Sequence, residues 1–206
     1  MTAYFQYGEK ETGHLKRADR RLAEAIEKIG PIKREVIPDL FAALINAIAG
    51  QQISTKAHRT VWERIRKELG RVTPDAVDRI PPERLQKTGI SHRKAAYMKS
   101  AARKVLSGEF DLDALTAMPD EKVCEKLSEL DGVGVWTAEM LMIFSMQRPD
   151  ILSYNDSAII KGLRLLYGHR TIDKARFERY RKRYSPYASV ASLYLWAVAS
   201  GEADGL

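Results

Sequence analysis

The stretch 130-LDGVGVWTAEM-140 places two glycines, Gly132 and Gly134, one residue apart between segments of helical pattern. PDEKVCEKLSEL precedes the turn and WTAEMLMIFSMQ follows it. A turn this short joins two helices at a steep angle and exposes a new helix N-terminus. The first backbone N–H groups of that helix have no partner within it. The stretch therefore predicts a helical hairpin whose amides face an outside group.

An anion is the natural partner for such amides. Glycine can adopt positive φ or let another backbone approach closely, and a helix N-terminus carries a partial positive charge. The chain has 34 Lys and Arg against 27 Asp and Glu, a net charge of +7. For a basic protein, a nucleic-acid phosphate is the expected occupant. The alternative is a plain helix hairpin whose glycines serve as C-caps.

Helical patterning continues along nearly all of the 206 residues. Apolar residues recur at helical spacing, and proline, serine, threonine or aspartate opens most segments. Besides the hairpin, helices are expected at 18–29, after Pro38-Asp39, after Ser54, from 73 and 81, after Ser91, and at 157–167, 173–184 and 186–199. Alternating strand patterns are scarce. The sequence predicts an all-α protein with about ten to twelve helices.

Several protein classes are disfavoured by what the composition lacks. The single cysteine, Cys124, excludes an internal disulfide and a cysteine-ligated iron–sulfur cluster, and we expect it to be a core thiol. The four histidines have no zinc-site spacing. The opening MTAYFQYGEKETG lacks the apolar segment of a signal peptide, and no apolar run reaches membrane-spanning length. We expect no cofactor and no membrane partner.

The hairpin stretch resembles the helix-hairpin-helix of the base-excision DNA glycosylase (HhH-GPD) superfamily. In that superfamily an essential aspartate follows about twenty residues later, and Asp156 lies 20 residues after Trp136, in LSYNDSAIIKGL. Upstream, IAGQQISTKA resembles the segment with the DNA-wedging residue, and YSPYASVASLYLW resembles the last helix. These four elements occur in family order from Phe41 to Trp196. The chain looks most like the AlkA-type 3-methyladenine DNA glycosylases.

This resemblance implies two helical lobes with the active-site cleft between them. One lobe would be a helical barrel over 39–146 that includes the hairpin at 130–140. The other would be discontinuous, with residues 1–38 and 147–206. Helical pattern begins near the start of the sequence, so we expect a compact version without the N-terminal β-domain of longer AlkA-type enzymes.

The resemblance also implies a monofunctional enzyme. Superfamily members that cut the DNA backbone carry a Schiff-base lysine two residues after the second hairpin glycine, where this chain has Trp136. An indole cannot form an imine. We therefore expect hydrolysis of the N-glycosidic bond of alkylated purines (3-methyladenine, 7-methylguanine, with etheno or deaminated bases as further substrates), leaving an abasic site without AP-lyase activity. The expected partner is double-stranded DNA with a damaged base, bound by a monomer in the cytoplasm (at the nucleoid), or in the nucleus of a eukaryote.

Asp156 has the chemistry that this reaction needs. Breaking an N-glycosidic bond leaves positive charge on the sugar, which a carboxylate beside C1′ stabilises while orienting water. One acid suffices when the leaving base already carries positive charge, as alkylated purines do. The alternative is that Asp156 is the N-cap of the helix that starts at Ser157. Both roles can hold for one residue.

The remaining site residues are assigned by resemblance. Gln52 would fill the gap left by the flipped base, with Ile53 as its apolar neighbour. A cationic base gains from aromatic faces, and the pocket candidates are Trp136, Tyr154 and Trp196. The expected phosphate contacts are Gly132, Val133, Gly134, Val135, Thr137, Arg93, Lys94 and Lys161.

The family also implies a monovalent cation at hairpin carbonyls near Gly132 and Gly134, although no side-chain spacing indicates a metal. Other functions stay open. A non-catalytic helix-hairpin-helix DNA-binding protein would share the hairpin and the charge but would not need Asp156 or Gln52. A glycosylase for oxidised, mismatched or deaminated bases would share every element. A helical small-molecule hydrolase has no positive support.

Overall fold

The computed structural model describes residues 2–202, and within them it contains twelve α-helices, one 3-10 helix and a single pair of two-residue strands. The all-α prediction is confirmed. Contacts between backbone segments divide the chain into two compact units. The central unit runs from Ile37 to Met146. The terminal unit combines the chain up to Val36 with the chain from Gln147 onward.

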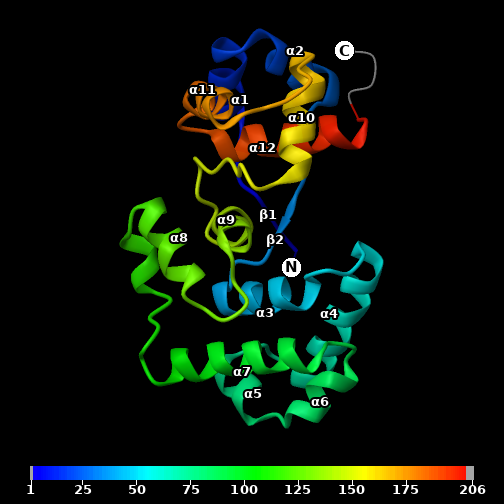
Figure 1. Cartoon of the computed structure of the whole chain (residues 1–206), viewed down its shortest axis with the longest axis vertical. Coiled ribbons are helices and arrows are strands. Elements are labelled where there is room, and N and C mark those ends of the chain that lie inside the picture. The colour runs from blue at the N-terminus through cyan, green and yellow to red at the C-terminus, as the bar shows by residue number, and fades with distance from the viewer. Residues whose placement is uncertain (1, 203–206) are drawn as a thin grey trace. The chain divides into compact units, whose positions relative to one another are not determined.

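The central unit is built around the helix with the most apolar sequence. Its elements are α3 (Leu40–Gly50), α4 (Thr55–Leu69), α5 (Pro74–Arg79), α6 (Pro82–Lys87), α7 (His92–Leu106), η1 (Ala114–Ala117), α8 (Asp120–Ser128) and α9 (Val135–Phe144). Helix α3 packs against α4, α7 and α9 (Figure 1). Its Leu44, Ile45 and Ile48 are fully buried, and each such side chain stabilises the fold by about 2 kcal/mol.

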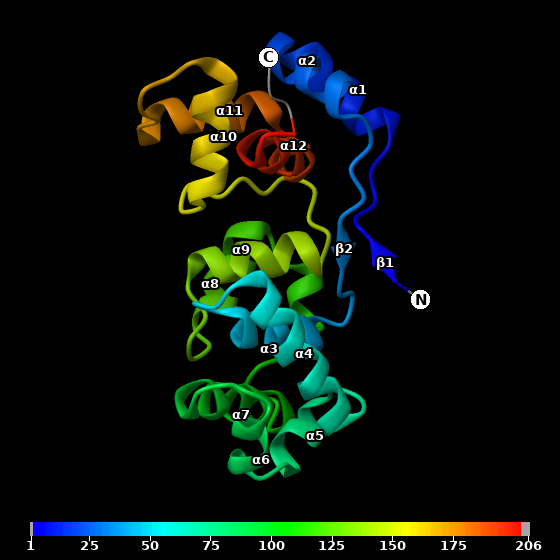
Figure 2. The ribbon, with the colours of Figure 1, turned by 90° about the vertical axis from the view of Figure 1, so that its right-hand side faces the viewer.

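The terminal unit is arranged around α12. Its elements are β1 (Ala3–Tyr4), α1 (Glu9–Ala18), α2 (Arg20–Ile29), β2 (Glu35–Val36), α10 (Ser157–Tyr167), α11 (Lys174–Tyr184) and α12 (Ala188–Ser200). Helix α12 contacts α1, α2, α10 and α11, as Figure 2 shows from the side. Gly162 lets α10 approach α12 closely, because a β-carbon at Gly162 would overlap the carbonyl of Leu195 on α12. Helix α10, which is capped by Asp156, therefore packs directly on α12.

Four elements were not predicted: α1, β1, β2 and η1. The sequence predicted one helix that begins at residue 18, but Ala18 is the last residue of α1. Asp19 separates α1 from α2. The Oδ1 atom of Asp19 accepts from Leu22 N at 2.9 Å and so caps α2. Strands β1 and β2 pair antiparallel over two residues each, which is too short for an alternating pattern, and η1 has four residues.

Among the described residues, no helix combines the length and the apolar character that a membrane crossing requires.

Candidate functional site

The hairpin turn lies between α8 and α9, and its two glycines differ in conformation. Gly132 has φ +78°, and a β-carbon there would overlap the ring of Tyr97. Gly134 has φ −93° and ψ 173°, which any residue can adopt. A β-carbon on Gly134 would meet no described heavy atom within 4 Å. The first glycine is therefore required by the fold, while the second leaves bare backbone facing outward.

The N-terminus of α9 provides the amides that the sequence predicted. The helical hydrogen bonds begin with Ala138 N donating to Gly134 O at 2.9 Å, so the amides of the preceding turn have no acceptor within the helix. Val133 and Thr137 are buried and anchor the turn, whereas Val135 and Trp136 are 47% and 45% exposed. This arrangement can hold an anion at the backbone with two apolar side chains beside it.

The carbonyl groups of the two glycines each accept one hydrogen bond. Gly132 O accepts from Gln51 Nε2 at 2.8 Å, and Gly134 O accepts from the amide of Ala138. Among residues 2–202, no group of three His, Cys, Asp or Glu side chains could hold a metal ion. The monovalent cation expected at the hairpin carbonyls stays a prediction.

The predicted wedge turn connects α3 to α4. Gln52 is exposed and has φ +56°, a left-handed conformation that is rare for a residue with a side chain. Ile53 is 39% exposed, which is unusual for isoleucine. The hydrogen bond from Gln51 to Gly132 O joins this turn to the hairpin turn. The structure therefore brings the predicted wedge and the predicted phosphate site together within the central unit.

The three predicted basic phosphate contacts differ from one another. Arg93 is exposed, with its guanidinium carbon 5.9 Å from the centre of the Tyr97 ring. Lys94 Nζ donates to the carbonyls of Ala49 and Gln51, and Lys161 Nζ donates to Ala199 O at 2.7 Å. Both lysines therefore neutralise the C-terminal ends of helices, which carry partial negative charge. Arg93 is the best placed of the three for phosphate.

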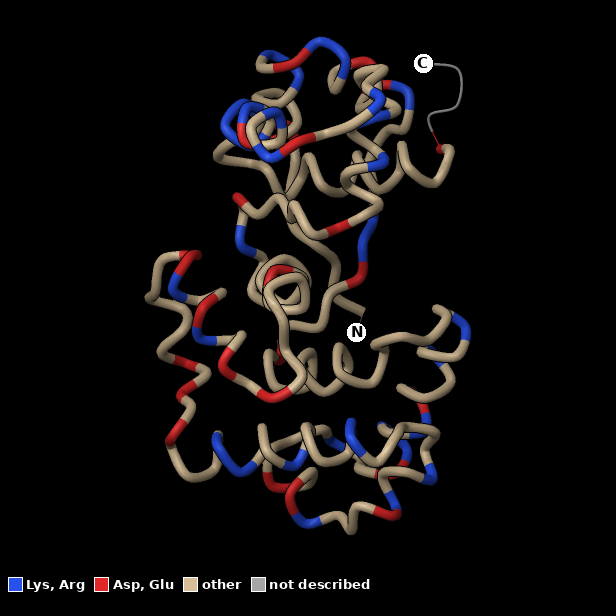
Figure 3. The backbone as a smooth tube through the Cα atoms, in the orientation of Figure 1, with Lys and Arg blue, Asp and Glu red and all other residues tan. Residues whose placement is uncertain are grey.

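Basic residues are densest on α11 in the terminal unit, visible as the blue helix in Figure 3. Lys174, Arg179 and Lys182 are exposed. Arg181 pairs with Glu178, and Arg183 pairs with the buried Asp19 at 2.6 Å. Part of the charge on α11 therefore stabilises the unit itself.

Asp156 is buried and caps α10. Its Oδ1 atom accepts from the amides of Ala158 at 2.9 Å and Ile159 at 3.0 Å. Asp156 is 7% exposed. The predicted N-cap role is confirmed, and the catalytic role stays a prediction. A carboxylate held this way keeps its orientation without rearrangement during a reaction.

The three predicted pocket aromatics are all accessible to some degree. Tyr154 is 38% exposed and contacts Phe177 edge-on, with ring centres 5.1 Å apart. Trp196 is half-buried, whereas every other residue from Ala188 to Ala199 on α12 is buried. Tyr154 and Asp156 lie two residues apart at the start of α10. The terminal unit thus combines the predicted acid with two of the aromatic rings.

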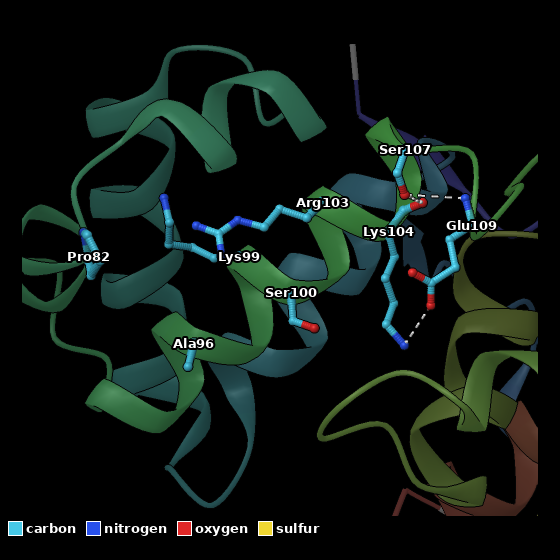
Figure 4. Close-up of a pocket in the computed structure, with 8 residues that line it drawn as sticks. All are labelled: Pro82, Ala96, Lys99, Ser100, Arg103, Lys104, Ser107 and Glu109. Carbon is cyan, nitrogen blue, oxygen red and sulfur yellow. Dashed lines mark hydrogen bonds and ion pairs between the residues drawn. The ribbon is translucent and has the colours of Figure 1, made fainter.

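A hollow of about 530 Å³ in the central unit contains none of the predicted residues (Figure 4). It is lined by Pro82, Ala96, Lys99, Ser100, Arg103, Lys104, Ser107 and Glu109. None of these side chains is aromatic, and the charged groups are already paired. Lys99 binds backbone carbonyls of Val77, Asp78 and Ile80, and Lys104 pairs with Glu109. We therefore do not assign substrate binding to this hollow.

Sequence reasoning missed three residues that support the site: Gln51, Tyr97 and His58. Gln51 joins the two turns, and Tyr97 packs against Gly132. His58 lies against Gly50, where a β-carbon would come 2.7 Å from the imidazole, and its Nε2 donates to Asn46 O at 3.0 Å. Tyr97 follows Arg93 by four residues, so both lie on one face of α7, and that spacing was the available signal.

The helical hairpin, the capped aspartate and the helical fold agree with the comparison to known families. Residues 45–186 match the HhH-GPD superfamily of base excision DNA repair proteins, and the chain belongs to this superfamily. The matched range includes the wedge turn, α7, the hairpin and Asp156.

Individual relatives agree with this assignment. DNA-3-methyladenine glycosylase 1 of Schizosaccharomyces pombe is 29% identical over 185 residues, covering 86% of this chain and 80% of that protein. The crystal structure of a DNA-3-methyladenine glycosidase from Bacillus halodurans is 33% identical, with a TM-score of 0.83, and covers 100% of this chain and 95% of that one. The S. pombe 3-methyladenine DNA glycosylase Mag1, solved in complex with abasic DNA, has a TM-score of 0.79 at 27% identity, covering 91% and 95%.

Proposed function

We propose that this protein is a monofunctional DNA glycosylase that removes alkylated purines from double-stranded DNA. The observation that carries the proposal is the buried carboxylate of Asp156, fixed by two backbone amides at the start of α10. The names of the relatives support 3-methyladenine as the substrate, and 7-methylguanine and etheno bases extend that class by the same chemistry. The product is an abasic site, and the active form is a monomer.

In this mechanism Asp156 stabilises the positive charge that develops on the deoxyribose as the glycosidic bond breaks. Its negative charge acts at short range in a site from which most water is excluded, where electrostatic stabilisation is strongest. The carboxylate also orients the water that attacks C1′. The alkylated purine leaves with the bonding electrons and needs no strong general acid, because it carries a positive charge before the bond breaks.

Trp136 is the reason that we propose a monofunctional enzyme. A lyase of this superfamily forms an imine through a lysine at this position, and an indole has no nucleophilic amine. The ring is 45% exposed at the start of α9, where it offers an aromatic face. A site that recognises bases mainly by stacking discriminates weakly among them, since few hydrogen bonds are left unmade by a wrong base. We therefore expect broad acceptance of alkylated bases.

DNA binding follows from the hairpin. The amides of the first turn of α9 bind a phosphate and set the register on the duplex without reading sequence. Gln52 enters the space that the flipped base leaves, and Ile53 packs against the neighbouring bases. Flipping costs a few kcal/mol and costs least at damaged positions, which adds selectivity before any chemistry.

A panel of lesion-containing DNA tests the proposal. Methylated genomic DNA and synthetic duplexes with one 7-methylguanine, ethenoadenine, hypoxanthine or 8-oxoguanine are incubated with the protein, and released bases are separated by chromatography. We expect release of 3-methyladenine or 7-methylguanine, strand breaks only after alkali, and no covalent complex on borohydride treatment.

Other results would redirect the assignment. Tight duplex binding with no base released from any substrate would indicate the non-catalytic DNA-binding protein. Release of 8-oxoguanine alone would indicate an oxidised-base glycosylase. Strand cleavage without alkali, or a trapped covalent complex, would contradict the monofunctional mechanism.

A further inference from the structure

The peptide group that joins Gln51 to Gln52 is held by a lysine from another helix. Lys94 Nζ donates to Gln51 O at 2.6 Å and to Ala49 O at 2.8 Å (both carbonyls at the end of α3). Ala49 belongs to the last turn of α3 and Gln51 is its C-cap, so neither carbonyl has an acceptor role within the helix. Burial lowers the pKa of the Lys94 ammonium group. The lysine is therefore partly withdrawn from solvent and directed into the fold.

The turn that Lys94 holds is strained. Gln52 has φ +56°, and a non-glycine residue in this region persists only where its surroundings fix it. The oxygen of the peptide bond that precedes Gln52 is one of the two acceptors of Lys94. A bond at this atom restrains the rotation of that peptide group. Lys94 thus acts directly on the conformation that leaves the Gln52 side chain exposed.

Two further contacts converge on the same segment. Gln51 Nε2 donates to Gly132 O in the hairpin, and the His58 ring fills the space beside Gly50. Lys94 itself is fixed at the start of α7, where its amide donates to Ser91 Oγ at 3.3 Å. The turn is therefore connected to α7 and to the hairpin, both of which belong to the central unit.

We propose that Lys94 is a positioning residue that holds the 51–53 turn in the shape that presents Gln52 for insertion into DNA, and that it is not a phosphate ligand. This inference rests on the proposed function for what the turn does, but the clamp itself is a property of the free protein. The sequence led us to expect Lys94 at a phosphate, and its two hydrogen bonds to carbonyls are the reason for the different assignment.

Salt dependence of DNA binding separates the two roles. Binding to an undamaged duplex is measured by fluorescence anisotropy over a range of KCl concentrations for the wild type, Lys94→Met and Arg93→Met. A lysine that neutralises a phosphate lowers the slope of log K against log salt by about 1 when it is removed. We expect an unchanged slope for Lys94→Met and a slope reduced by about 1 for its exposed neighbour, Arg93→Met. A reduced slope for Lys94→Met would overturn the proposal.

Hydrogen exchange tests the clamp in the free protein. The amide of Gln51 donates to Ile48 O at 3.4 Å, and we expect it to exchange roughly tenfold faster or more in Lys94→Met, the factor implied by losing a charged hydrogen bond. Lys94→Arg, which keeps a charged donor, should restore most of the protection. Lys99→Met is the matched control, because Lys99 binds carbonyls at the end of α5 from the same helix. It should leave exchange at the Gln51 amide unchanged.

Single-turnover excision at saturating protein completes the test. Misplacing the wedge should slow excision roughly tenfold or more in Lys94→Met, with no such change in Lys99→Met. A duplex with 2-aminopurine at the target position reports insertion even if no base is excised, and its signal should fall in Lys94→Met. If the wild type excises nothing, the proposed function fails while exchange and salt slope still decide the clamp. Unchanged exchange in a folded Lys94→Met would refute the clamp.

Discussion

Tyr97 lies so close to Gly132 that a β-carbon on the glycine would overlap the tyrosine ring. One side of the hairpin turn is thus closed by α7, and φ +78° at Gly132 follows from the sharp bend. Gly134 has an ordinary conformation and nothing around its would-be β-carbon. Gly132 is therefore required by the fold, whereas Gly134 leaves its backbone accessible from outside the protein.

Replacing Gly132 with alanine should destabilise the protein. The substitution places a side chain in the left-handed region, which costs about 1–2 kcal/mol, and the overlap with Tyr97 adds to that. We expect the free energy of unfolding to fall by at least about 2 kcal/mol, measured by urea denaturation. An unchanged urea midpoint would mean that the turn relaxes freely.

Replacing Gly134 with alanine should weaken DNA binding while leaving the stability of the protein nearly unchanged. Loss of glycine at the N-cap changes stability by less than about 1 kcal/mol, since the backbone there is unstrained. A methyl group would, however, stand where a phosphate approaches the amides of α9. We expect weaker binding to duplex DNA by anisotropy, with a nearly unchanged urea midpoint. Full affinity in this variant would place the DNA backbone elsewhere.

Local features of the fold were predictable because they depend on neighbours in sequence. Helix α10 was expected at Ser157–Tyr167 and has those limits, since Asp156 caps it and Gly168 ends it. The hairpin was predicted from its glycines alone. Helix α1 was missed, because the polar 9–18 segment contains Gly13 and has a single buried residue, Leu15.

The parts of the site that sequence could not supply depend on contacts far apart in the chain. Lys94 and Lys161 were predicted to meet phosphate because they are basic residues near the motifs. In the protein without DNA their ammonium groups bind carbonyls 38 to 45 residues away, and no pattern indicates which carbonyls come within reach. The same holds for Gln51 and Gly132, which are 81 residues apart.

Asp156→Asn should separate the catalytic role from the cap. Asparagine caps helices as well as aspartate does, so the variant should fold with near-normal stability. It lacks the negative charge, and we expect the excision rate to fall at least roughly 10²-fold. The rate is measured under single-turnover conditions, and thermal unfolding reports stability.

Asp173→Asn is the matched control. Asp173 caps α11 in the same unit, with Oδ1 accepting from Arg176 N at 2.7 Å. This variant should keep the wild-type excision rate. Equal losses in the two variants would show that the effect is not specific to the charge at Asp156. Near-normal excision by Asp156→Asn would remove Asp156 from the mechanism.

The stability of the protein should depend on pH through His58. Burial lowers the pKa of His58, the charge of Lys94 lowers it further, and the hydrogen bond to the Asn46 carbonyl partly opposes both. Between the lowered pKa and the ordinary value of about 6.5, the unfolded chain therefore binds more protons than the folded protein. The contribution of neutral His58 is complete above about pH 6.5 and is lost as the pH falls through the folded pKa.

We therefore expect wild-type protein to lose more stability than His58→Gln between about pH 7 and pH 5, measured by urea denaturation at each pH. Groups that titrate in both proteins, including His169 with its own lowered pKa, cancel in the comparison. Because His58 packs beside Gly50 at the end of α3, its protonation should also loosen the 51–53 turn. The protection of the Gln51 amide, relative to its intrinsic exchange rate at each pH, should therefore fall from pH 7 to pH 5 in the wild type alone. Parallel stability curves for the two proteins would show that His58 gains its proton without disturbing the fold.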